Sequence, residues 1–245
     1  MYKDYLNINE GELYDYKLIE YNNYYLYQEL KNILKNTTEL TIVGKGPTAK
    51  YVENGIGINQ AMIFTGKKYV FFTDFQSLFG IEKYFKDIKY IFFPDYPQAV
   101  CCMDKNINYI TVIKYLKKYG FKGKIFIFQT HTTLANNKIR AFRFKYNNTV
   151  VIPLKFFSLF FNIKKYNFYG IGVGEGYHKE LSKLDFSISY TNQEHIDLVK
   201  QGDKMNKDYV EPKTSIYKKN AFYPNLIKTT FDEIEKEYGI KIIYN

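Results

Sequence analysis

Short apolar runs alternate along the chain with longer segments in which apolar residues recur every three or four positions. The runs lie at residues 40–44, 56–60, 69–73, 89–93, 124–128 and 166–170. Runs of this length are typical of buried strands, whereas spacings of three and four are typical of amphipathic helices. Their alternation predicts an α/β fold, a Rossmann-like and mostly parallel sheet with helices on both faces.

Helical patterns lie before and between these runs. They cover residues 16–36, 76–85, 109–119, 150–163 and 229–238, and a terminal strand follows at 240–244. Gly120 stands where a helix C-terminal cap belongs, and Pro153 must lie in the first turn of its helix.

We expect one domain over residues 1–245, with an N-terminal helical extension at about 1–37. A further apolar run predicts a strand at 186–190. The stretch at about 201–220 is polar and is typical of a long loop.

The chain is basic and rich in aromatic residues. It has 245 residues, a formal net charge of +10, 26 tyrosines, 21 phenylalanines and no tryptophan. The excess of Lys, Asn, Ile, Tyr and Phe is typical of an AT-rich genome. The charge would also favour partners that carry phosphate, but the lysines are scattered as pairs, a pattern typical of solvated helix ends and loops. A nucleic-acid partner is therefore an alternative that the sequence does not favour.

Targeting signals and disulfides are not predicted. No apolar stretch of about 18 residues is present, so the sequence predicts no membrane span. The polar N-terminus does not resemble a signal peptide, and two adjacent cysteines cannot form a disulfide framework. The cytoplasm is the default compartment, with peripheral association with a membrane as the alternative. The sequence does not indicate an oligomeric state.

Polar residues and glycines follow most of the predicted strands. In an open parallel sheet, ligands bind beyond the carboxyl ends of the strands. Candidate site residues after successive strands are therefore Gly44, Gly46, Pro47 and Thr48, then Asn59 and Gln60, then Asp74, and finally Gly170, Gly172 and His178.

The first glycine loop is the strongest single element. Two glycines let a backbone approach a ligand, and Pro47 suits the first turn of a helix whose free N–H groups can hold a phosphate. Residues 44–49 also fit the dinucleotide pattern G-x-G-x-x-A, although the acidic residue expected about 20 positions later is replaced by Asn59-Gln60. A tight strand-to-helix turn without a ligand is the alternative.

A second glycine cluster, at residues 170–176, precedes His178. Such a backbone either lies against a ligand or forms a flexible loop. The imidazole of His178 could act as a general base near neutral pH, or it could be an ordinary surface histidine.

Several common catalytic motifs are missing. The histidines and cysteines lack the spacing of a zinc site, and the sequence contains no Asp-x-Asp, nucleophile elbow or Walker loop. The sequence therefore predicts neither a metal site nor a bound cofactor.

Three segments together resemble glycosyltransferase family 42, the bacterial sialyltransferases. They are Ile42-Val43-Gly44-Lys45-Gly46-Pro47-Thr48, Gly57-Ile58-Asn59-Gln60, and residues 66–79, which include Thr73-Asp74-Phe75-Gln76-Ser77-Leu78-Phe79. Weaker similarity returns at 165–172 and 229–244. A looser resemblance is to the 6-hydroxymethylpterin pyrophosphokinase-like family.

The first resemblance implies a Rossmann-like fold and metal-independent sialyl transfer from CMP-sialic acid to a glycan acceptor. It implies that Gly44, Gly46, Pro47 and Thr48 hold the phosphate and ribose of the donor, and that Asn59 and Gln60 line the nucleotide pocket.

The chain departs from the family at four places. Asp74 replaces an asparagine, and Thr149-Val150-Val151 replaces Thr-Ser-Gly. Gly170-Ile171-Gly172 replaces Gly-x-Asp, and Phe222-Tyr223 falls where the catalytic histidine is expected. His178, Glu175 or Asp74 would then have to act as the base. The alternatives are a catalytically silent nucleotide-binding protein of the same fold, or a Mg²⁺-dependent diphosphate transferase or nucleotide hydrolase.

Overall fold

The computed structural model describes residues 16–72, 75–94, 109–128, 150–171, 178–184 and 224–245. All seven strands of its single sheet run parallel, in the order β5-β4-β3-β2-β1-β6-β7. The strands are β1 (Glu39–Val43), β2 (Ile56–Ile58), β3 (Tyr69–Phe71), β4 (Tyr90–Pro94), β5 (Lys124–Phe128), β6 (Lys165–Tyr169) and β7 (Lys241–Tyr244). The predicted α/β parallel fold is confirmed.

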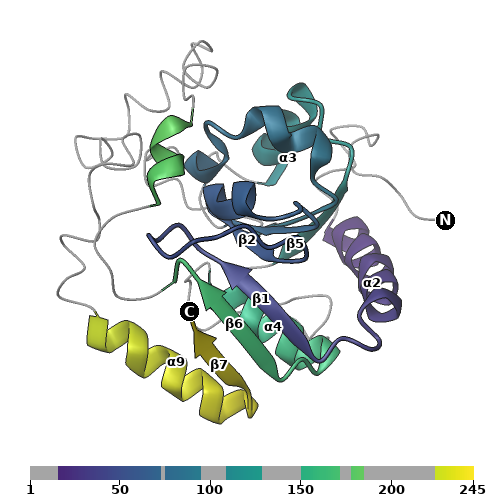
Figure 1. The fold of residues 1–245 in the computed structure, drawn as a ribbon. Helices are drawn as coiled ribbons and strands as arrows, with labels where there is room; N and C mark the ends of the chain where they lie inside the picture. Colours follow the sequence, from purple (N-terminus) through teal and green to yellow (C-terminus); the bar gives the residue numbers. More distant parts are fainter. Residues whose placement is uncertain (1–15, 73–74, 95–108, 129–149, 172–177, 185–223) are drawn as a thin grey trace.

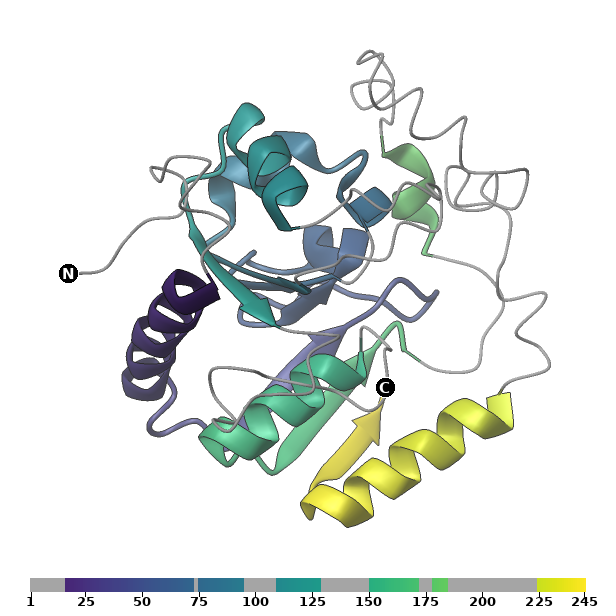
Figure 2. The same cartoon turned by 180° about the vertical axis from the view of Figure 1, so that it is seen from behind.

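Helices cover both faces of the sheet (Figure 1). The α-helices are α2 (Tyr16–Ile33), α3 (Tyr109–Lys118), α4 (Val151–Phe161) and α9 (Pro224–Tyr238). The 3₁₀ helices are η2 (Asn59–Phe64), η3 (Phe75–Leu78), η4 (Glu82–Asp87) and η5 (Lys179–Lys183). Helices α2, α4 and α9 pack on one face (Figure 2), and α3 and the short helices pack on the other.

Most of the helices expected between the strands are confirmed. Gly120 adopts φ +81° directly after α3, and Pro153 lies in the first turn of α4. The single helix expected at 76–85 is wrong, because η3 and η4 replace it and Gly80, at φ +78°, lies between them. The expected strand at 186–190 and the loop at 201–220 lie outside the described residues.

Aromatic rows fill the core beneath α4. Phe71, Phe92 and Phe126 occupy one register row across β3, β4 and β5, with ring centroids 4.1 and 5.6 Å apart. Phe156 and Phe157 of α4 meet this row edge-on. These rings are fully buried, and each buried aromatic side chain contributes a large apolar area. Much of the phenylalanine content therefore builds the interior.

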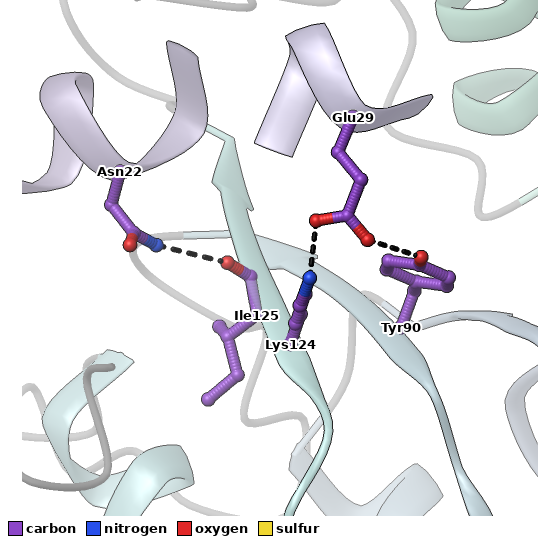
Figure 3. A network of polar contacts seen from close by, with 5 residues as sticks. All are labelled: Asn22, Glu29, Tyr90, Lys124 and Ile125. Carbon is purple, nitrogen blue, oxygen red and sulfur yellow. Dashed lines mark hydrogen bonds and ion pairs between the residues drawn. The ribbon is translucent and has the colours of Figure 1, made fainter. Parts of the chain in front are cut away.

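Side chains from helices satisfy both edges of the sheet. On β5, the Asn23 amide donates to the carbonyl oxygen of Ile127 at 2.6 Å and accepts from its N–H at 3.2 Å. Asn22 donates to the carbonyl oxygen of Ile125 at 3.4 Å (Figure 3). On β7, Glu235 of α9 accepts from the N–H of Ile242 at 2.6 Å. These bonds occupy peptide groups that would otherwise pair with a foreign strand.

An ion pair also joins α2 to the first residue of β5. Glu29 binds Lys124 and accepts a hydrogen bond from the Tyr90 hydroxyl at 2.6 Å (Figure 3). Leu26, Leu30 and Leu34 enter the same core as α4. The described part of the expected N-terminal extension is therefore packed into the domain.

The amino ends of the strands form one edge of the sheet, and all turns leading into them lie within the described residues. Lysines gather in these turns, in the last turns of the preceding helices and at the first strand positions. We call them the amino-edge lysines: Lys31, Lys35, Lys67, Lys68, Lys86, Lys89, Lys117, Lys118, Lys122, Lys124, Lys164, Lys165, Lys236 and Lys241.

Asn23→Ala should lower the free energy of unfolding by about 1–3 kcal/mol, because both Ile127 peptide groups lose their partner. Asn22→Ala removes one longer bond and should cost less. Urea unfolding at pH 7 measures both variants. A larger loss for Asn22→Ala would contradict the proposed pairing of Asn23 with the edge.

The Glu29 pair should make stability depend on pH. Partial burial opposes the charged form, but hydrogen bonds from Lys124 and Tyr90 and the charge of Lys124 hold the pKa of Glu29 below its ordinary range. A lowered pKa contributes stability above the unfolded-state pKa of about 4.3, and this stability is lost as pH falls through the folded-state pKa.

Glu29→Gln should therefore be less stable than the parent by about 0.2–1 kcal/mol at pH 7, since the pair is partly exposed. The difference should close as pH falls below about 4.3. Urea midpoints collected from pH 7 down to pH 3 test this. A difference that stays constant over that range would rule out the ion pair as its source.

Candidate functional site

The strand order places a topological switch point between β1 and β6. The chain builds the sheet outward from β1 through β2, β3, β4 and β5, then returns to place β6 on the other side of β1. The connections after β1 and β6 therefore lead to opposite halves of the sheet. In open α/β sheets, ligands bind in the crevice outside the carboxyl ends of two such strands.

Three of the predicted site glycines meet at this point. The Gly44 N–H donates to the carbonyl oxygen of Tyr169, and the Gly46 N–H donates to that of Gly170, both at 2.8 Å. A Cβ on Gly44 would lie 2.5 Å from the Gly170 oxygen, and one on Gly46 would lie 2.9 Å from it. Gly170 has φ +64°, and its own Cβ would lie 2.4 Å from the Gly44 oxygen. Glycine is thus required at these three positions because the two backbones lie too close together for a Cβ.

The expected helix after Gly46 is wrong. Pro47 and Thr48 form an exposed turn, and Ala49 donates its N–H to the carbonyl oxygen of Gly46 at 3.0 Å. The chain then extends, so that the N–H of Val52 reaches the carbonyl oxygen of Phe64. The N–H groups of Gly44, Gly46 and Ala49 are therefore used within the protein, and this loop does not present a helix N-terminus.

The side chain of Thr48 adds a further hydrogen bond between the two loops. Its hydroxyl oxygen accepts a hydrogen bond from the Gly170 N–H at 3.0 Å. The two loops are thus joined by three hydrogen bonds in a buried contact without side chains between the backbones. We call this contact of Gly44, Gly46 and Gly170 the glycine floor.

Asn59 and Gln60 begin η2 at the carboxyl end of β2, next to β1 in the sheet. Both are buried, and Asn59 has φ +55°, a conformation that asparagine tolerates better than most residues. The reversal brings Met62 against Gly57, where a Cβ would lie 2.5 Å from the Met62 Cα. The Oδ1 atom of Asn59 is buried without a hydrogen-bond partner, so it is an acceptor available at this edge.

His178 also reaches the glycine loop. Its N–H donates to the carbonyl oxygen of Lys45 at 2.8 Å, and its ring meets Phe64 edge-on at 4.7 Å. Its Nδ1 accepts the N–H of Glu180 at 3.2 Å and so caps η5. A neutral imidazole carries one proton, so this bond places it on Nε2. In this arrangement Nε2 is a donor, and a role as base would require the cap to break.

Two charged groups flank these residues. Lys50 lies 4.0 Å above the ring of Tyr169, the residue before Gly170. Glu180 is hydrogen-bonded to Lys183, which holds the pKa of Glu180 below its ordinary range and keeps it ionised at neutral pH. Sequence reasoning missed Lys50 and Phe64 as neighbours of the site, because both contacts join distant parts of the chain.

The remaining predicted site residues cannot be placed. Asp74, Gly172 and the alternative base Glu175 lie outside the described residues. Within the described ranges, no cluster of three or more His, Cys, Asp or Glu side chains could hold a metal ion. In the same part of the chain, no helix is both long and apolar enough to cross a membrane.

Comparison of the chain with protein-family models, curated proteins and solved structures finds no match. The assignment of a function therefore depends on the residues and geometry of this chain.

Alanine at Gly44 or Gly46 should destabilise the protein, because each Cβ would press on the Gly170 backbone. We expect a loss of about 1–3 kcal/mol, the usual cost of overpacking, with Gly44→Ala the more severe because its contact is shorter. Urea unfolding measures both. Parent-like stability in both variants would show that the two loops do not meet in this way.

Proposed function

We propose that the chain binds a nucleotide-activated sugar at the β1–β6 crevice and transfers the sugar, of the sialic-acid type, to a glycan without a metal ion. The observation that carries the proposal is the position of the glycine floor at the topological switch point of the sheet. Residues of two of the three segments of the family resemblance, 42–48 and 57–60, stand at the same edge.

The glycine floor fixes the position of the loop that would meet the ligand, because the facing backbone fills the side of Gly44, Gly46 and Gly170 that lacks a Cβ. A ribose or a base would lie against the exposed turn of Pro47 and Thr48 beside it. The unpartnered Asn59 Oδ1 at the end of the neighbouring strand is a suitable acceptor for a ligand N–H or hydroxyl group.

The phosphate of the donor needs a positive partner beside this floor. The N–H groups of Gly44 and Gly46 are already used, so a helix-type phosphate site is not part of the proposal. Lys50, which lies over Tyr169 at the end of β6, is a cation close to the floor. We therefore assign Lys50 to the donor phosphate.

A second candidate is a nucleotide-binding protein of the same fold without transfer activity. It is favoured by the bond between His178 Nδ1 and the Glu180 N–H, which leaves His178 as a donor. The two candidates share the nucleotide site and differ in whether the acceptor hydroxyl is deprotonated.

Thermal-shift measurements with CMP, UDP, GDP, ATP and CMP-sialic acid, with excess EDTA and with Mg²⁺, test the shared site. A ligand at 100 times its dissociation constant should add about 2.7 kcal/mol of stability. We expect CMP and CMP-sialic acid to stabilise the protein equally in both buffers, and Lys50→Ala to weaken this effect. Stabilisation that requires Mg²⁺ would favour the diphosphate-transferase alternative, and no stabilisation by any nucleotide would contradict the proposal.

His178→Asn separates transfer from binding, because asparagine keeps an N-cap acceptor but cannot act as a base. If His178 is the base, CMP release from CMP-sialic acid with lactose as acceptor should fall about 10²- to 10⁴-fold, with donor affinity unchanged. A change below about threefold would limit His178 to capping η5. Absence of release by the parent protein, together with nucleotide binding, would support the second candidate.

A further inference from the structure

The fold brings lysines that are scattered in the sequence to one edge of the molecule. Every strand of the sheet starts at the same edge, and five of the seven have a lysine at the first strand position or directly before it. The preceding helices end at this edge as well, and α2, α3 and α9 each carry lysine in their last turn. The fourteen amino-edge lysines therefore share one side of the protein, opposite the candidate site.

These lysines carry most of the excess charge. None of the fourteen is buried, and ten are exposed. The carboxylates at the same ends and turns are fewer: Glu29, Glu39, Glu53, Asp87, Glu235 and Glu237. Among the described residues, ion pairs bind two of the amino-edge lysines, Lys124 to Glu29 and Lys165 to Glu39. The edge therefore holds a net positive charge close to the +10 of the whole chain.

Helix dipoles account for part of this pattern. A helix C-terminus carries about half a negative charge, which one nearby lysine can offset. Lys117 and Lys118 exceed that need at the end of α3, and Lys89 follows a short 3₁₀ helix with Lys86 already in its last turn. The surplus is large enough to attract a polyanion.

We infer that the amino-edge lysines bind the phosphate backbone of a nucleic-acid duplex. Lysine contacts phosphate as a point charge and does not read bases in the bidentate way of arginine, so the binding should not depend on sequence. An anionic membrane is less suitable, because stable membrane contact normally adds a set of apolar anchors to basic residues. Of the large exposed apolar side chains in the described residues, Ile33, Tyr51 and Leu159 lie near this edge, on three separate segments.

Because the sheet is twisted, only lysines at neighbouring strands can contact one straight duplex, and these are the lysines to substitute. Each strand turns about 20° relative to its neighbour, so a straight duplex can touch only adjacent strand starts. Lys86 and Lys89 precede β4, Lys117 and Lys118 precede β5, and these two strands are neighbours. All four side chains are exposed, so glutamine at each position should leave the fold intact.

The experiment measures binding of the full chain to a fluorescent 24-base-pair DNA duplex and to the matching RNA duplex between 50 and 200 mM NaCl. We expect micromolar or weaker binding that falls steeply with salt. The quadruple variant Lys86→Gln, Lys89→Gln, Lys117→Gln, Lys118→Gln should lose at least tenfold in affinity at 100 mM NaCl. Its slope of log K against log salt should become less negative by about 0.9 for each phosphate that the variant no longer neutralises.

A matched pair of variants controls for net charge. Lys117→Gln, Lys118→Gln removes two charges from the amino edge, and Lys179→Gln, Lys183→Gln removes two from η5 near the other edge. The first should weaken binding several-fold, and the second less than twofold. Equal loss in both pairs would overturn the inference. So would absence of duplex binding by the parent at 50 mM NaCl, or tighter binding to vesicles containing phosphatidylserine than to either duplex. None of these three results bears on nucleotide binding at the β1–β6 crevice.

Discussion

The pairing of β1 with β6 joins two parts of the sheet that are far apart in the sequence. Five residues of each strand are in register, from Glu39 opposite Lys165 to Val43 opposite Tyr169. Beyond the last pair, the two chains stay in contact because Gly44, Gly46 and Gly170 have no side chains to separate them. The connections after the two strands therefore diverge from a buried contact between peptide groups. Asn59 and His178, which arrive from two other segments, complete the described part of the candidate site.

Much of the fold could be predicted from local pattern. Each described strand matches an apolar run. The match is clearest for β2, β3 and β4, which are buried along their whole length and so need apolar residues on both faces. The two failures have different causes, one a long-range contact and the other a local backbone conformation. The pattern around Gly46 suits a helix start, but the Gly170 backbone, 124 positions away, uses the N–H of Gly46. The helix expected at 76–85 fails at Gly80, whose positive φ interrupts it.

The candidate site was also predictable only in part, because local pattern locates strand ends but does not show contacts between distant residues. Strand ends and glycines identified Gly44, Gly46 and Gly170, since the carboxyl ends of parallel strands share an edge. The sequence could not show that these glycines contact one another, nor that His178 uses Nδ1 to cap η5. One signal could have identified the sheet edge in advance. Asn22 lies between Leu18 and Leu26 on the apolar stripe of α2, and a polar residue at such a position needs a buried partner.

The attachment of α2 to β5 has a consequence for the order of folding. Asn22 and Asn23 are made early in synthesis, but the peptide groups they bind follow 103 and 104 residues later. In proteins most of the stability of a helix comes from tertiary packing of its apolar face, so α2 gains much of its stability once β5 is in place. The contact between α2 and β5 closes a loop of about 100 residues, which is entropically costly and therefore expected late in folding. Until then, the outer peptide groups of β5 have no partner. Helix α2 is therefore synthesised before β5 and covers the outer edge of this strand when the two meet.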